Sequence, residues 1–320
     1  SDEGGFLAIA RAWRHGATLY RDVWVDRPQG LLVVYRLFSL LGGGASTVRV
    51  IGLVFGAAGV VAVAAAVRSV AGDWAGLVAA FVAALLSAAP AIEGFSSNGE
   101  LLSGAMSAAA VALALYALCS ASPARRPGPW MFAAGATGAF AWSLKQSGAD
   151  GMAAVGLWLV VAALAGWLPR RRALTHLAAL VGGAVALFAA CALHAVLTEW
   201  HGWWYAVIGY RAEQRSALVG ANWPRLWRTA SATWLVWVPA VLAVGFALWA
   251  RPPTADGEAD LARHLRLLMP MWLGFAVLGF LSGGQFFDHY WVGLMFPLGA
   301  IVGVTVGRLP RARIQYGLLS

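Results

Sequence analysis

Lys145 is the single lysine of the chain and stands at the end of the apolar stretch 130–146. His289 has a similar place, directly before the apolar stretch 290–307. An ionisable side chain beside a long apolar stretch is by default a candidate for function, because burying its charge is costly. An ammonium or protonated imidazole can hold an anion. The ordinary alternatives are a lysine that extends to an interface and a hydrogen-bonded structural histidine.

Most carboxylates also lie beside apolar stretches, where they could accept a proton from a reacting group. Asp2 and Glu3 open the sequence, before residues 4–15, whose apolar side chains recur at helical spacing. Acids at a helix start are also explained by the positive end of the helix dipole, and this explanation fits Glu100, directly before 101–119. Glu93 fits substrate contact and plain solvation in a loop equally well.

Long apolar stretches must position these residues. Of the 320 residues, 60% are hydrophobic and 12% are charged, whereas about 25% of a soluble domain is charged. A bilayer core needs about 20 apolar residues per helix, and continuous runs of Ala, Leu and Val exclude a barrel, whose strands alternate polar and apolar residues. We therefore predict an all-α, polytopic transmembrane bundle of about nine spans plus juxtamembrane helices. The predicted spans are 49–67, 75–92, 101–119, 130–146, 151–168, 174–197, 231–250, 265–283 and 290–307.

The basic residues indicate an orientation in the membrane. The net charge of +9 comes largely from arginines in every second connection, which the positive-inside rule assigns to the cytoplasm, so we expect no nucleic-acid partner. The opposite connections are 93–100, 145–150, 199–230 and 284–289. We expect a multi-pass protein of the cell membrane whose active site faces the extracytoplasmic side. The arginines concerned are Arg68, Arg125, Arg126, Arg170, Arg171, Arg172, Arg251, Arg263, Arg266, Arg308, Arg311 and Arg313.

We expect one integral membrane domain over 1–320. Residues 1–48 form an extracytoplasmic juxtamembrane loop with short helices, 49–307 the bundle, and 308–320 a cytoplasmic tail. The apolar segment 30–42 contains Arg36 and is short for a crossing, so we predict an interfacial or re-entrant helix there. The alternative is that 30–42 crosses the membrane and Arg68 is not cytoplasmic. We also expect a transmembrane helix before the acidic pair.

Cofactor motifs are missing from the sequence. Cys119 and Cys191 lie near or within apolar spans, and the chain has no CxxC, HExxH, P-loop or strand-associated GxGxxG. We expect no disulfide scaffold and no cofactor, and we assign no metal ligands.

A series of short motifs resembles GT-C membrane glycosyltransferases, most closely the group that contains protein O-mannosyltransferases and the lipid A aminoarabinose transferase. Each motif is weak alone, but together they span nearly the whole chain in a consistent order. Two features depart from the family: Arg27-Pro28-Gln29 stands where Lys-Pro-Pro is common, and no helix precedes Asp2 in this sequence. The motifs are Asp2-Glu3, residues 16–22, Asp26-Arg27-Pro28, residues 93–100, Leu144-Lys145-Gln146 and residues 286–290.

The resemblance implies transfer of a sugar from a polyprenyl-phosphate donor to a lipid, glycan or protein acceptor, usually with inversion. It implies that Asp2 is the base that takes the acceptor proton, with Glu3 as its neighbour. Arg27, Lys145 and His289 would bind the donor phosphate. The remaining candidates for substrate binding are Asp26, Glu93, Asn98, Glu100, Gln146 and Tyr290. The Ala, Gly and Arg bias suggests mannose or arabinose on a decaprenyl-type carrier.

Residues 199–230 form the longest connection and are rich in Trp, Tyr and Arg. Because long connections tend to be functional, we expect residues 199–230 to cover the cavity or select the acceptor. Deleting or substituting 211–215 should then change the acceptor choice or the rate. Two other classes remain open. A secondary transporter or lipid flippase would place ionisable residues near the middle of spans, and a degenerate homologue would be non-catalytic.

Overall fold

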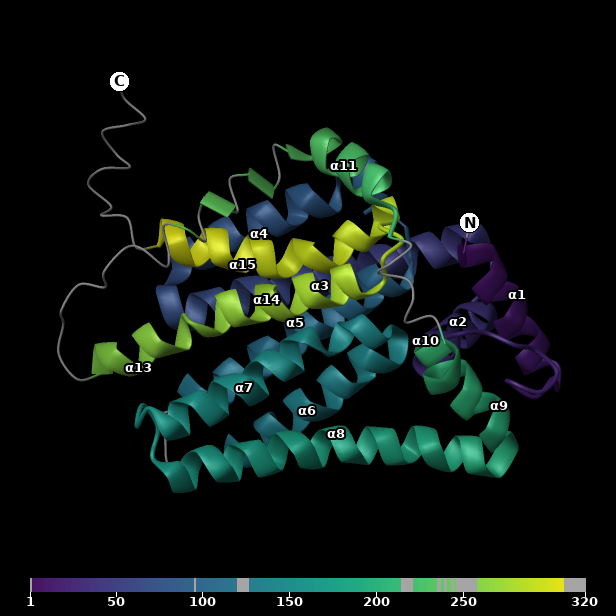
Figure 1. The fold of residues 1–320 in the computed structure, drawn as a ribbon, viewed down its shortest axis with the longest axis horizontal. Coiled ribbons are helices and arrows are strands. Elements are labelled where there is room, and N and C mark those ends of the chain that lie inside the picture. Colours follow the sequence, from purple (N-terminus) through teal and green to yellow (C-terminus); the bar gives the residue numbers. More distant parts are fainter. Residues whose placement is uncertain are drawn as a thin grey trace.

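The computed structural model describes residues 2–94, 96–119, 127–213, 221–234, 237–238, 241–242, 245 and 258–307. Within these residues the regular elements are helices, and the predicted all-α fold class is confirmed. Most helices run along one direction and form an elongated bundle (Figure 1). Its main helices are α3 (Ala45–Ala71), α4 (Asp73–Ser87), α5 (Gly99–Cys119), α6 (Pro127–Leu144), α7 (Asp150–Leu164), α8 (Arg170–Thr198), α14 (Leu268–Ser282) and α15 (Met295–Val306).

Six helical segments in the described part of the chain are long and apolar enough to cross a membrane. The predicted count of nine spans is not established. The stretch 75–92 forms the 15-residue helix α4 and then a short 3-10 helix, Pro90–Ile92, rather than one long helix. Most of the stretch 231–250 lies outside the described residues. The six segments are Ala45–Ala71, Gly99–Cys119, Gln146–Leu164, Arg170–Thr198, Leu261–Ser282 and Asp288–Val306.

Glycines let the long helices α6 and α8 touch through their backbones. A Cβ atom on Gly135 of α6 would lie 1.9 Å from the carbonyl oxygen of Leu180. On α8, a Cβ atom on Gly183 would lie 1.9 Å from the carbonyl oxygen of Phe132. Small residues at such crossings allow the close van der Waals packing that holds membrane helices together. These two glycines therefore fix α8 against α6, and through α6 they support Lys145 at its end.

The two ends of the bundle differ chemically, as the charge pattern predicts. At one end, Arg266 Nε donates to the carbonyl oxygen of Val70 at 2.9 Å, and Arg172 Nη2 donates to that of Leu118 at 3.3 Å. The first contact joins the end of α3 to the turn that follows α13 (Glu258–Leu265). The second joins the end of α5 to the start of α8. At the opposite end, the acidic residues meet Lys145 and His289. The two ends thus offer different binding surfaces.

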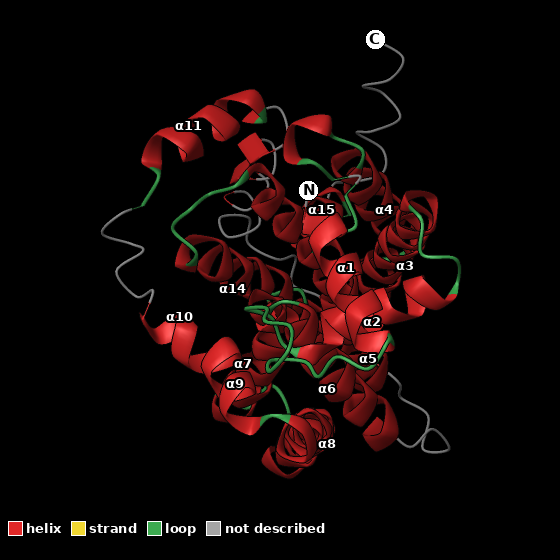
Figure 2. Cartoon of the chain, turned by 90° about the vertical axis from the view of Figure 1, so that its right-hand side faces the viewer, coloured by secondary structure: helices red, strands yellow, loops and turns green. Residues whose placement is uncertain are grey.

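Two short helices cover the acidic end. The helix α1 (Asp2–Arg14) has the amphipathic character predicted for 4–15, and α2 (Gln29–Leu40) forms where 30–42 was predicted. Both lie in front of the bundle when it is viewed from this end (Figure 2). Phe6 and Ala10 of α1 pack with Tyr35 of α2 in one apolar cluster. With 12 residues, α2 is shorter than the roughly 20 residues of a span.

Residues 199–230, the longest connection that we predicted, contain several short helices. The structure shows α9 (Trp200–Trp204), a π-helical turn (Tyr205–Gly209), α10 (Tyr210–Glu213) and α11 (Trp223–Ala232). Local capping explains two of the helix starts. The Glu199 side chain accepts a hydrogen bond from Gly202 N, and the Asn222 side chain accepts one from Arg225 N. The intervening residues 214–220 lie outside the described part of the chain.

Candidate active site

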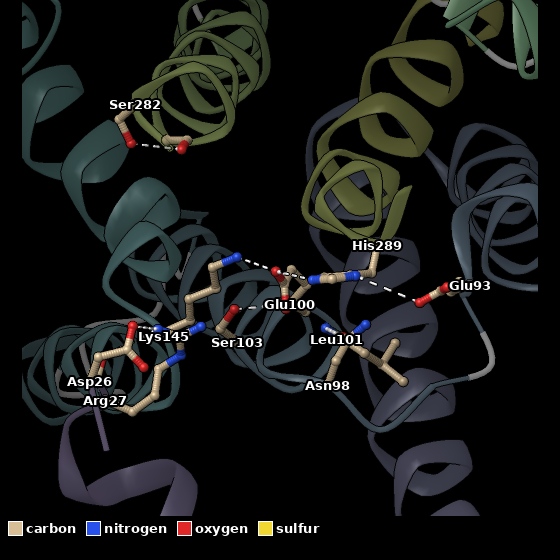
Figure 3. Close-up of polar contacts among 11 residues, drawn as sticks. Asp26, Arg27, Glu93, Asn98, Glu100, Leu101, Ser103, Lys145, Ser282 and His289 are labelled. Atoms are coloured by element: carbon tan, nitrogen blue, oxygen red, sulfur yellow. Dashed lines mark hydrogen bonds and ion pairs between the residues drawn. The ribbon is translucent and has the colours of Figure 1, made fainter. Parts of the chain in front are cut away.

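A buried carboxylate, Glu100, is the centre of the candidate site. It lies in the first turn of α5 and is 6% exposed. The side chain of Asn98 starts this helix by accepting a hydrogen bond from Leu101 N at 2.9 Å. Lys145 Nζ pairs with Glu100 Oε1, and His289 Nε2 lies 3.6 Å from the same oxygen. In Figure 3, Lys145 and His289 point toward Glu100 from different sides.

Lys145 is placed by the end of α6. The helix stops at Leu144, and Lys145 is extended before the short 3-10 helix Gln146–Ala149. Its ammonium lies 3.9 Å from the centre of the Tyr290 ring, and its side chain is 14% exposed. An aromatic face attracts a cation most strongly when both are withdrawn from water. Lys145 therefore does not simply extend into solvent; its charge is held inside the protein by Glu100 and Tyr290.

His289 bridges two carboxylates. It lies on the 3-10 helix Asp288–Leu294, with its ring stacked on Phe287. Its Nδ1 atom lies 3.6 Å from Glu93 Oε2, opposite the contact of Nε2 with Glu100. Glu93 adopts a left-handed backbone conformation with φ of 52° after a short 3-10 helix, and its side chain points toward His289 (Figure 3). A protonated His289 can donate toward both acids, or toward an anion that replaces one of them.

Arg27 is the third basic residue of the site. Its Nη1 atom lies 2.7 Å from Asp26 Oδ2, and its side chain is 15% exposed. Figure 3 shows Arg27 on the Lys145 side of the site, and its charge acts on Glu100. Arg27 precedes Pro28, which starts α2. The hydroxyl of Tyr20 donates to the carbonyl oxygen of Arg27 at 2.9 Å, and this anchors the segment.

The turn before Arg27 is held by its own polar contacts. Tyr20 has a φ of 70°, and burial raises the pKa of its hydroxyl, which therefore stays protonated as a donor. Asp22 accepts hydrogen bonds from Arg21 and from Thr18 N, and these bonds lower its pKa to about 2. Asp22 is thus charged at any ordinary pH. The hydrogen bonds of the turn that supports the Arg27 backbone should therefore not change with pH well above this pKa.

Glu3 fastens α1 to the rest of the site. Its Oε1 atom accepts a hydrogen bond from Ser97 N at 2.6 Å, and its Oε2 atom lies 3.1 Å from Arg49 Nη2 on α3. These contacts place the first turn of α1 beside the loop that leads into α5. Asp2 is the first residue of α1. Its side chain lies outside the described residues, so its predicted role as the base stays a prediction.

A cavity of about 420 Å³ lies beside His289. Glu93 and His289 line the cavity and also belong to the charged cluster, so the two are continuous. The Nδ2 atom of Asn98, which also lines it, is buried and has no hydrogen-bond partner among the described residues. A buried donor without a partner is costly, and a ligand hydroxyl could satisfy it. The lining residues are Glu3, Glu93, Ser96, Asn98, Arg225, Arg228, Phe287, Asp288 and His289.

Arg225 and Arg228 were not among the residues that we singled out from the sequence. Arg225 Nη1 donates to the carbonyl oxygen of Gln285 at 3.0 Å, and its guanidinium lies over the ring of Phe287. Arg228 Nη2 lies 3.6 Å from Asp288 Oδ1. Both come from α11, where their spacing of three residues puts them on one helical face. That spacing was the available signal. Our prediction covered 199–230 as a whole and chose 211–215 for the test, most of whose side chains lie outside the described residues.

The structure therefore brings most of the predicted site residues together. Arg27, Lys145, His289 and Glu100 form the cluster, with Asp26, Glu93 and Tyr290 as direct contacts of its cations. Gln146 follows Lys145, and its Nε2 atom is buried without a partner among the described residues. In the same part of the chain, no three His, Cys, Asp or Glu side chains form a group that could hold a metal ion. The expectation that no cofactor takes part stays a prediction, and the sequence left a divalent metal possible but not indicated.

Comparisons with known proteins identify the fold. No family model matches the sequence, and no curated protein matches it. The structure is similar to that of ArnT from Cupriavidus metallidurans bound to undecaprenyl phosphate, with a TM-score of 0.68 and 19% identity, over 100% of this chain and 58% of that chain. It is also similar to the apo state of ArnT from that organism, with a TM-score of 0.64 and 18% identity, over 99% and 57%. The chain thus spans less than two thirds of these proteins, and the GT-C resemblance is confirmed for the fold.

Proposed function

We propose that this protein is a membrane glycosyltransferase that takes a sugar from a polyprenyl-phosphate donor and transfers it to an acceptor hydroxyl. The observation that carries the proposal is the gathering of Arg27, Lys145 and His289 around the buried Glu100. The shared fold supports it, because ArnT has been solved with undecaprenyl phosphate. Each of the three basic side chains already lies beside an acidic side chain, so its position is fixed before a donor binds.

The exposure of the acids determines which of them can yield to a phosphate. The side chain of Glu100 is 7% exposed and stays in place, whereas Asp26 is 26% and Glu93 is 51% exposed. Moving the more exposed acids toward water costs little, so they can release Arg27 and His289 to the donor. The phosphate then accepts charge-assisted hydrogen bonds from these cations and from Lys145. Glu100 keeps Lys145 aimed at the site throughout.

The transfer step follows from this arrangement. The acceptor hydroxyl attacks C1 of the sugar while Asp2 takes its proton, and the bond from C1 to the phosphate oxygen breaks. The electron pair goes to the phosphate, and the polyprenyl phosphate leaves with its added charge stabilised by the three cations. Asp2 is assigned by resemblance. Its neighbour Glu3 lines the cavity, which supports a place for Asp2 at the same entrance.

The cavity beside His289 is the proposed place for sugar and acceptor. Asn98, whose Nδ2 atom has no partner among the described residues, lines this cavity, and Arg225 and Arg228 line it from α11. The charge pattern of the sequence assigns this end to the extracytoplasmic side. Under this proposal residues 1–48 are the juxtamembrane part of a single membrane domain. The acceptor is a lipid, glycan or protein that reaches this side.

Donor dependence tests the proposed function. Purified protein is given a labelled decaprenyl-phosphate sugar together with cell-envelope membranes as acceptor source. We expect time-dependent release of decaprenyl phosphate and the appearance of label in a lipid, glycan or protein fraction. A parallel reaction with the corresponding nucleotide sugar is the control and should give no transfer. Absence of transfer from decaprenyl-phosphate mannose and arabinose alike would contradict the proposal and favour a transporter or a non-catalytic protein.

A further inference from the structure

Gln29 is a buried polar residue at the start of α2, two positions after Arg27. It is 4% exposed, and both ends of its side-chain amide make hydrogen bonds. Its Oε1 atom accepts from Trp203 Nε1 of α9 at 2.7 Å, and its Nε2 atom donates to the carbonyl oxygen of Cys191 of α8 at 2.9 Å. Because an indole N–H can only donate and a carbonyl oxygen can only accept, these partners fix the orientation of the amide. Gln29 thus joins the start of α2 to two helices that are distant in the sequence.

The backbone of Arg27 is held by hydrogen bonds on both sides. On one side, the hydroxyl of the buried Tyr20 donates to the carbonyl oxygen of Arg27 at 2.9 Å. On the other side, only Pro28 separates Arg27 from Gln29, and the proline ring fixes its own φ angle. A single stiff residue therefore transmits the position of Gln29 to the backbone of Arg27.

The residue after Gln29 brings the same segment against the helix that carries Lys145. A Cβ atom on Gly30 would lie 2.0 Å from Ser143 Oγ and 2.9 Å from the carbonyl carbon of Ser143. A contact this close to a backbone requires a glycine, and Ser143 is two residues before Lys145 at the end of α6. The start of α2 is thus fixed to α6 by Gly30 and to α8 and α9 by Gln29.

The side-chain contacts of Arg27 do not replace these backbone anchors. Arg27 Nη1 donates to the carbonyl oxygen of Asp26 at 3.1 Å and to Asp26 Oδ2 at 2.7 Å. Asp26 is the adjacent residue in the chain, so it moves together with Arg27 and cannot set the place of the guanidinium relative to Lys145. The anchors on either side of Arg27 must set this place, and Gln29 is the one that reaches α8 and α9.

We propose that Gln29 is a positioning residue of the donor site, which holds Arg27 where its guanidinium and the ammonium of Lys145 reach the same phosphate. This inference rests on the proposed function and deepens it. A proline at position 29, as the resembling motif commonly has, could make neither hydrogen bond of the amide. Because Gln29 acts through a cation, it should affect the binding of the phosphate and not that of the lipid chain.

Binding of decaprenyl phosphate to the whole chain in detergent tests this proposal, with decaprenol as the same lipid without the phosphate. We expect Gln29→Leu and Trp203→Phe each to weaken the binding of decaprenyl phosphate about tenfold, the cost of misplacing one charged donor. Each should change decaprenol binding less than about twofold. In an Arg27→Gln background, Gln29→Leu should weaken decaprenyl phosphate binding by less than about a further twofold, because the guanidinium that it positions is gone.

Trp158→Phe is the matched control for Trp203→Phe. Trp158 Nε1 donates to the carbonyl oxygen of His264 at 2.8 Å, so this substitution also removes one buried indole hydrogen bond, but beside α13 at the opposite end of the bundle. We expect a similar fall in melting temperature for the two variants and unchanged decaprenyl phosphate binding for Trp158→Phe.

The outcomes separate this inference from the proposed function. Unchanged decaprenyl phosphate binding in both Gln29→Leu and Trp203→Phe would overturn the positioning role and leave the donor site intact. An equal loss of decaprenol binding, or a full tenfold further loss in the Arg27→Gln background, would do the same. A wild-type protein that binds decaprenyl phosphate no better than decaprenol would overturn the donor site and this inference together.

Discussion

Lys145→Met is expected to reduce sugar transfer by about 100-fold to 1,000-fold, the usual cost of removing one donor that stabilises developing negative charge. The substitution also removes the ammonium that pairs directly with the buried Glu100. Breaking a buried ion pair from one side destabilises a protein by about 3–5 kcal/mol. The measured quantities are the transfer rate and the thermal unfolding transition in detergent. Both should fall in the single variant.

The double variant Lys145→Met/Glu100→Gln separates these two effects. Removing both charges leaves no unpaired ion, so much of the lost stability should return. The transfer rate should not return, because the donor phosphate still lacks the lysine. Recovery of activity in the double variant would show that Lys145 serves only to neutralise Glu100. The cation cluster would then be a folding device rather than a phosphate site.

Asp2→Asn is expected to lower the rate of transfer by about 100-fold to 10,000-fold, because an amide cannot take the acceptor proton. Donor binding should change little, since the proposed phosphate contacts are made by other residues. A single-turnover assay at saturating donor measures the chemical step, and decaprenyl phosphate binding provides the comparison.

Glu3→Gln is the matched control for Asp2→Asn. The amide oxygen of Gln can still accept from Ser97 N, but the ion pair with the half-exposed Arg49 is lost. That pair is partly in water and contributes about 1 kcal/mol or less, so we expect a loss of less than about tenfold. An Asp2→Asn variant as active as Glu3→Gln would assign the base to another residue.

Burial of charge explains what could be predicted from the sequence. Because a charge is costly inside a bilayer, uncharged apolar stretches predicted the helices. The few ionisable residues at the ends of these stretches then indicated candidate site residues. Lys145 was found in this way, whereas His289 and Glu100 were singled out through the resemblance to GT-C proteins. Their convergence on a single oxygen of Glu100 could not be predicted, because the pairing depends on how α5, α6 and the segment before α15 pack together.

Other features depend on local or tertiary contacts that leave a weak trace in the sequence. Between 199 and 232, the side chain of Glu199 caps the start of α9 and that of Asn222 caps the start of α11. The many tryptophans in this segment gave no clear helical spacing of apolar residues. Arg225 is recognisable as a cavity residue only once Phe287 and Gln285 are known to lie beside it. Composition was enough to predict a membrane protein, whereas the residues that line the cavity could be identified only from the fold.

A structure of the full chain in a lipid nanodisc with decaprenyl phosphate tests the central claim most directly. We expect the phosphate within about 3 Å of donor atoms of Arg27 and Lys145, with the His289 ring turned from Glu93 toward it. We also expect Asp26 to have moved away from Arg27, with Glu100 still paired to Lys145. A phosphate bound elsewhere on the protein, with Arg27 and Lys145 still on their acidic partners, would contradict the account.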